Sequence, residues 1–84
     1  MDRFQEMRVL LAVTEAESFA GGAKLLGISP PSVTRAVAAL EARLGTLLLA
    51  RSTRSLRLTE AGQALLEHAT GIFAIEAAAE QDLK

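Results

Sequence analysis

The 84 residues suffice for one small domain and exclude a second folded module. Half of them are apolar, with Ala and Leu dominant, which favours helices over an all-β fold, and the lack of Cys excludes disulfides and cysteine nucleophiles. The net charge of -1 is unevenly spread: residues 1–19 carry -2, residues 20–58 carry +5 and residues 59–84 carry -4. A basic centre of this kind is expected of a surface that binds a polyanion.

The charge pattern also bears on location. The longest charge-free stretch, residues 25–34, is too short to span a membrane and contains two prolines. The first residues are charged where an export signal would be apolar. We therefore expect a cytoplasmic protein with no membrane partner.

Capping residues predict the first two helices. Asp2 begins a capping box for an amphipathic helix over 3–16. Ser18 is the expected N-cap of a short helix over 19–26, which ends at Gly27.

The third predicted helix, 30–44, has the clearest boundaries. Ser29 is the expected N-cap, Pro30 takes the first helical position, and Gly45 ends the helix. One face is apolar and the opposite face is small and polar, with Val33, Val37, Leu40 and Leu44 on the first and Pro31, Thr34, Arg35 and Ala38 on the second.

A short β-hairpin with a basic tip is predicted over 47–58, followed by a last helix that Thr59 caps and that runs to about Asp82. This helix would be roughly 36 Å long at ~1.5 Å per residue, more than one face of a small core can cover. We expect a DNA-binding domain over 1–58 and a linker and dimerisation helix over 59–84.

This order of elements predicts a mainly α winged helix-turn-helix fold, with a three-helix core, a short β-hairpin wing and a long C-terminal linker helix. Its expected partner is double-stranded DNA, with helix 30–44 in the major groove and the wing at the minor groove or backbone. Small side chains at Ser32, Thr34 and Ala38 allow close approach to bases, and Arg35 can make a bidentate contact to guanine.

Three runs of sequence between Phe4 and Gly62 carry a more specific resemblance: ESFAGGAKLLGISPPSVTRAVAALEARLG, LLARSTR and LRLTEAG. They resemble the N-terminal DNA-binding domain of LysR-type transcriptional regulators. The resemblance implies a recognition helix bearing Pro31, Ser32, Thr34 and Arg35, a minor-groove contact by Arg54, and phosphate contacts by Arg51 and Thr59. The full set of expected DNA-binding residues is Ser29, Pro30, Pro31, Ser32, Thr34, Arg35, Arg51, Thr53, Arg54, Arg57 and Thr59.

The resemblance also implies a homodimer paired through the last helix, and a small-molecule effector that acts only through a C-terminal domain absent from this chain. We expect the helix to run past the body beyond Gly71, so that Ile72, Phe73 and Ile75 need a second copy to cover them. The expected interface residues are Leu65, Ala69, Ile72, Phe73, Ile75 and Ala79. Two-fold pairing predicts an inverted-repeat DNA site.

An enzyme is not expected, because the acidic residues do not converge and the single histidine, His68, has no obvious catalytic partner. No cofactor or metal is expected. The alternative function is a winged-helix protein–protein interaction module without DNA binding, and a weaker one is a small dimerising antitoxin-like protein. The basic central block favours DNA over both.

Overall fold

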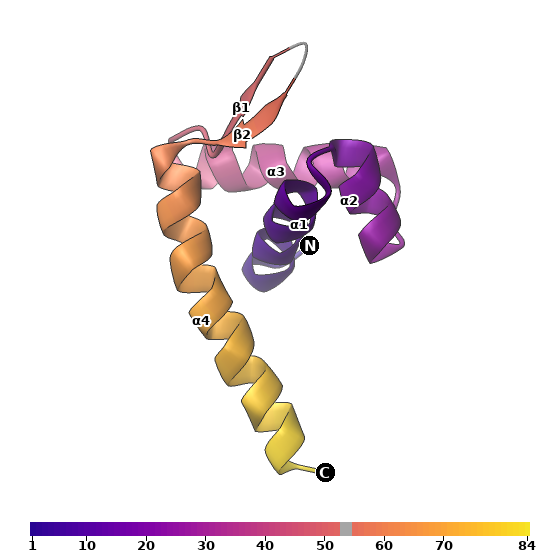
Figure 1. Cartoon of the computed structure of the whole chain (residues 1–84), viewed down its shortest axis with the longest axis vertical. Helices are drawn as coiled ribbons and strands as arrows, with labels where there is room; N and C mark the ends of the chain where they lie inside the picture. Colours follow the sequence, from indigo (N-terminus) through magenta and orange to yellow (C-terminus); the bar gives the residue numbers. More distant parts are fainter. Residues whose placement is uncertain (53–54) are drawn as a thin grey trace.

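The computed structural model describes residues 1–52 and 55–84, so Thr53 and Arg54 of the predicted set lie outside the described residues. Figure 1 shows the helices α1, α2 and α3 gathered together, the hairpin projecting from them, and the long helix α4 running to the C-terminus. The elements are α1 (Arg3–Ala16), α2 (Phe19–Leu26), α3 (Pro30–Leu44), β1 (Leu49–Arg51), β2 (Leu56–Leu58) and α4 (Glu60–Asp82). This is the predicted mainly helical winged helix-turn-helix fold.

The helix boundaries form at the predicted capping residues. The side chains of Asp2, Ser18 and Ser29 each accept a hydrogen bond from the backbone N–H three residues later. Gly27 and Gly45 end their helices with φ of 68°, a left-handed conformation that favours glycine. The turn between α2 and α3 is therefore short and well defined.

The core is one apolar cluster to which all four helices and the start of the hairpin contribute. Its most deeply buried large side chains come from α1, α3 and the segment before β1, namely Leu10, Val13, Val33, Val37, Leu40 and Leu48. Leu44, the last residue of the predicted apolar stripe, is instead 46% exposed. The outward face of α3 is thus held on a rigid base of buried side chains.

Helices α1 and α2 approach each other closely at Gly22. A Cβ atom at this position would lie 2.9 Å from the Cα atom and 3.0 Å from the backbone nitrogen of Val13. Only glycine fits at this position of α2, because any side chain would meet the backbone of Val13. The close approach of the two helices thus accounts for a residue of low helix propensity inside α2.

The hairpin is anchored by polar contacts on both sides. The strands pair antiparallel, with Leu49 opposite Leu58 and Arg51 opposite Leu56. At the start of β1, the backbone N–H groups of Leu48 and Leu49 donate to Glu41 Oε2 at 2.8 and 3.3 Å. The predicted apolar run includes Leu47, which the structure leaves 64% exposed, before the first paired residue.

The helix α4 starts against the hairpin and contacts α1, and its last turns extend beyond the other helices (Figure 1). Its residues Leu66, Ala69 and Phe73 belong to the core of the same chain, at 7%, 0% and 9% exposure. The expectation that Phe73 needs a second copy to cover it was therefore wrong, because the ring packs edge-on against Phe4 at a centroid distance of 5.2 Å. Ala69, also expected at the dimer interface, is buried inside its own protomer.

The remaining predicted interface residues differ in exposure. Ile72 and Ile75 are 43% and 73% exposed, Ala79 is exposed, and Leu65 is half-buried. No helix of the described residues is long and apolar enough to cross a membrane. The division at Thr59 stays a prediction, although the shared core joins the two parts at Leu66.

Candidate nucleic-acid interface

The first turns of α3 present the predicted reading surface. Ser29, Pro30, Pro31, Thr34 and Arg35 are exposed there. Pro30 occupies the first helical turn, where its missing N–H costs no hydrogen bond. A helix whose outward side chains are this short allows its backbone to approach a groove closely.

Internal hydrogen bonds hold the polar groups of this surface. The Ser29 and Ser32 hydroxyls lie 2.7 Å apart, and Arg35 Nη2 donates to Ser32 Oγ at 3.4 Å. The Thr34 hydroxyl donates to the backbone oxygen of Pro30 at 3.2 Å. Thr34 can therefore offer a base edge its methyl group and an acceptor oxygen, while the long bond from Arg35 is weak enough to exchange for a base.

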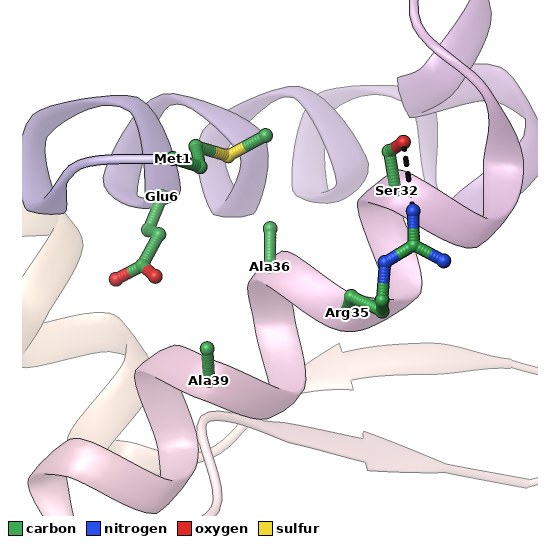
Figure 2. A pocket seen from close by; sticks show the side chains of 6 residues that line it. All are labelled: Met1, Glu6, Ser32, Arg35, Ala36 and Ala39. Atoms are coloured by element: carbon green, nitrogen blue, oxygen red, sulfur yellow. Dashed lines mark hydrogen bonds between the residues drawn. The ribbon is translucent and has the colours of Figure 1, made fainter.

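A hollow lies between the start of α1 and the side of α3 that faces it. Figure 2 shows Met1 and Glu6 on one side, and Ser32, Arg35, Ala36 and Ala39 on the other. Within this hollow the Arg35 side chain turns toward Ser32 rather than toward Glu6. The guanidinium is therefore not tied up by the only carboxylate among these lining residues.

One arginine of the basic block is committed elsewhere. Arg43, at the end of α3, forms an ion pair with the buried carboxylate of Glu6 on α1. Because this pair neutralises its charge inside the fold, Arg43 adds little to a surface for phosphates. Within residues 20–58, the exposed cations that the structure describes and that pair with no carboxylate are therefore Lys24, Arg35, Arg51 and Arg57.

The two described wing arginines point to opposite faces of the hairpin. Arg51 shares its face with buried Leu49, two residues earlier, and pairs with Leu56. Arg57 pairs with Ala50, whose side chain alternates to the other face. The predicted group of wing arginines is thus divided by the register of the strands.

Arg51 stacks on an aromatic side chain that was not among the predicted site residues. Its guanidinium carbon lies 4.5 Å from the centroid of the Phe19 ring, at the start of α2. The spacing of the two residues in the sequence contains no signal for this contact, which depends on the position of the hairpin. A stacked guanidinium keeps its N–H groups available at its edge, so Phe19 positions Arg51 without using its hydrogen-bond donors.

A second hollow opens beside this pair, between the start of α2 and the hairpin. Its lining contains one arginine, three serines and one acidic residue. The lining residues are Glu17, Ser18, Phe19, Arg51, Ser52, Ser55 and Leu56. The first N–H groups of a helix and its dipole favour an anion at such a place. The hollow therefore suits a phosphate of a nucleic-acid backbone better than a base.

Thr59 is engaged in the fold. Its hydroxyl donates to the backbone oxygen of Leu47 at 2.7 Å and accepts from the N–H of Gly62, and its own N–H donates to Leu48. Both of its hydrogen-bond donors are used in this way. Thr59 therefore joins α4 to the start of the wing, and a phosphate contact by this residue would need one of these bonds to break.

Comparison with known proteins agrees with this geometry. Residues 4–63 match the family model described as bacterial regulatory helix-turn-helix protein, lysR family. The chain is 47% identical over 70 residues to the HTH-type transcriptional regulator TcbR of Pseudomonas sp. (strain P51). This match covers 83% of the chain and 24% of TcbR. It is 46% identical over 72 residues to a probable hydrogen peroxide-inducible genes activator of Mycobacterium avium, covering 86% of this chain and 22% of that protein.

The same family appears among solved structures. The crystal structure of the CbnR DNA-binding domain with DNA superposes with a TM-score of 0.87 at 41% identity, over 98% of this chain and 93% of that one. The DNA complex of the BenM DNA-binding domain with catB site 1 gives 0.87 at 28% identity, over 98% and 92%. The chain spans about a quarter of the length of the curated relatives given above. On this evidence the chain belongs to the LysR family of bacterial regulatory helix-turn-helix proteins.

Proposed function

We propose that this chain binds double-stranded DNA in a sequence-specific way as the DNA-binding part of a transcriptional regulator. The observation that carries the proposal is the exposed first half of α3, where small polar side chains and Arg35 stand on a rigid base. The DNA complexes of the similar CbnR and BenM domains support it. The chain acts by binding alone, with no catalytic step, cofactor or metal, and it works in the cytoplasm, where the chromosome is.

In this proposal α3 enters a major groove. Thr34 and Arg35 read base edges, because a threonine methyl group fits against thymine and a guanidinium can donate twice to guanine. The end of α3 that lies closest to the groove is formed by Ser29, Pro30, Pro31 and Ser32. Ala replacement of Thr34 or Arg35 should cost about 1 to 3 kcal/mol on the best site and little on random DNA.

The wing supplies backbone and minor-groove contacts. Arg51 takes a phosphate beside the start of α2, and Arg57 reaches another from the opposite face of the hairpin. Thr53 and Arg54, which lie outside the described residues, are the remaining predicted contacts, and Arg54 is the one expected in the minor groove. A narrow A·T-rich groove would favour this arginine most.

The active unit in the proposal is a homodimer paired through α4. With 3.6 residues per turn, Ile72, Ile75, Ala79 and Leu83 lie in one exposed stripe, about a quarter turn from the side chains that enter the core. Leu65 continues the stripe toward the body of the domain. Such a pair would recognise an inverted repeat, and any small-molecule effector would act through further domains of the regulator.

Selection of binding sites from random duplex DNA, followed by affinity measurements with Thr34→Ala and Arg35→Ala, tests the proposal. We expect an enriched inverted repeat, with altered preference at one or two positions in each variant. An enriched sequence that both variants prefer unchanged would mean that α3 is not the reader. The absence of any enrichment would favour the alternative, a winged-helix module that binds a protein.

A further inference from the structure

The contact between α4 and the other helices that lies farthest from the start of α4 is made by Arg8 of α1. Its guanidinium carbon lies 4.7 Å from the ring centroid of Phe73 and 5.2 Å from that of Phe4. Its Nη2 atom lies 3.7 Å from Glu76 Oε1, one turn beyond Phe73. One side chain of α1 thus contacts two successive turns of α4.

This cluster is also the last one along the helix. Beyond Glu76, every residue of α4 is exposed. At the other end, Thr59 and Gly62 tie α4 to the segment before β1, and a Cβ atom on Gly62 would lie 2.2 Å from the Leu48 oxygen. The core residues Leu66 and Ala69 pack between these two points. The direction of α4 is therefore set by a tight joint at its start, by this core packing and, at the far end, by the Arg8 cluster about 21 Å farther on.

The joint at the start of α4 and the Arg8 cluster near its end differ in strength. The joint at the start is made of backbone contacts and close packing, which leave little room to slide. In the Arg8 cluster Phe73 is buried, but the two charged side chains are partly open to solvent, with side-chain exposures of 44% for Arg8 and 38% for Glu76. Exposed ion pairs contribute little, so the cation–π contacts of the guanidinium with the two rings are the larger contribution here.

We propose that Arg8 is a positioning residue that sets the direction of α4 relative to the recognition helix. The proposal rests on the function given above, in which α4 pairs two protomers. The exposed stripe residues Ile75, Ala79 and Leu83 lie beside or beyond the cluster, so a swing of α4 moves one recognition helix relative to the other. Arg8 then determines which separation of half-sites the dimer prefers, without contacting DNA.

A distance measurement tests the first part directly. Because the chain has no cysteine, spin labels can be placed at Ala42→Cys on α3 and Gln81→Cys on α4, with the labelled protein diluted in unlabelled protein. We expect a narrow distance distribution in the parent and a broader or shifted one in Arg8→Ala. Arg8→Lys, which keeps the charge but not the planar group, should restore only part of the narrow distribution.

Two further variants complete the measurement. Arg3→Ala removes an exposed positive charge from the same helix and should leave the distribution unchanged. Glu76→Gln removes the ion pair with Arg8, together with the charge interaction between Glu76 and Glu80, and leaves both ring contacts of Arg8 in place. It should give a smaller change than Arg8→Ala, and it keeps the test open if Arg8→Ala does not fold. Unchanged distributions in folded Arg8→Ala, or in Glu76→Gln and Arg8→Lys together, would overturn the proposal.

A DNA experiment tests the consequence. The parent and Arg8→Ala are compared on the duplex selected by the parent, on versions with the spacer changed by one or two base pairs, and on a single half-site. We expect Arg8→Ala to discriminate between spacers about threefold to tenfold less than the parent, with unchanged affinity for the half-site. Equal discrimination by both proteins would overturn the link to half-site spacing. A parent that binds no duplex would instead refute the proposed function, and the label distances would still decide the role of Arg8.

Discussion

The guanidinium of Arg51 stacks on the ring of Phe19, with its central carbon 4.5 Å from the ring centroid, and this contact joins the wing to the start of α2. The two residues are separated in sequence by the whole of α3. Because the ring restricts the arginine side chain without occupying its donors, Arg51 is ordered before any ligand arrives. Less side-chain entropy is then lost when it binds a phosphate.

The first prediction concerns Phe19. Phe19→Leu should lower affinity for all duplexes by about twofold to fivefold without changing the preferred sequence, because stacking is lost while an apolar side chain remains. Fluorescence anisotropy on a selected and a random duplex measures this. In an Arg51→Ala background the same replacement should have no effect, and an equal loss in both backgrounds would mean that Phe19 acts through the core alone.

The second prediction concerns two glycines in helices. Gly22→Ala should destabilise the domain by about 1 to 3 kcal/mol, because the added methyl group meets the backbone of Val13. Gly71→Ala is the matched control, since nothing lies within 4 Å of a Cβ atom there. This control should stabilise by about 0.5 to 1 kcal/mol through helix propensity. Urea denaturation measures both, and a stabilising Gly22→Ala would contradict the close packing of α1 and α2.

The third prediction concerns pH. A hydrogen bond with Glu80, with smaller effects of desolvation and repulsion by Glu80, raises the pKa of Glu76 above its ordinary 4.5, while Arg8 opposes the shift. The folded state therefore holds this proton more readily than the unfolded state, and the associated stability is lost as the pH rises through the raised pKa. At neutral pH the two carboxylates, one turn apart, repel each other.

Replacing Glu80 by Gln should consequently raise the melting temperature at neutral pH, with the gain shrinking once the pH falls below the raised pKa of Glu76. Thermal unfolding followed by circular dichroism at several pH values measures the difference. Glu67→Gln on the same helix serves as the control for loss of one exposed carboxylate. A gain from Glu80→Gln that is the same at acid and neutral pH would contradict this coupling.

The fourth prediction concerns pairing through α4. Ile75→Glu should weaken the dimer, because it places a charge in the exposed stripe without touching the core. Ala77→Glu, on an exposed position of the same helix, is the control. Sedimentation over a range of concentrations, with and without an inverted-repeat duplex, measures both. One protomer bound at saturation in the parent, unaffected by Ile75→Glu, would refute the homodimer.

Local signals explain why much of the fold could be predicted. The boundaries of α3 depend on Ser29, Pro30 and Gly45, which act within a few residues of themselves. The apolar residues of α4 that were expected at the dimer interface form a less informative pattern, because such a pattern does not say whether its own body or a partner covers them. Phe73 satisfies the pattern and packs on Phe4, whereas Ile75 satisfies it and is exposed.

The features that could not be predicted join residues distant in the sequence. The ion pair of Glu6 with Arg43 removes one charge from the basic block, and the register of the hairpin separates Arg51 from Arg57. Each depends on the angle between elements rather than on local composition. The local pattern of α3 therefore predicted the exposure of Thr34 and Arg35, whereas no local pattern predicted how the wing arginines are divided between two faces.

The affinity of the purified domain for duplex DNA, measured as a function of salt, tests whether this surface binds DNA. We expect a steep linear fall of log affinity with log salt, because each neutralised phosphate contributes a slope of about 0.9. Arg51→Ala should reduce the slope by about that amount. An affinity that does not change with salt, or a protein that does not bind duplex DNA at low salt, would contradict the claim that this surface binds DNA.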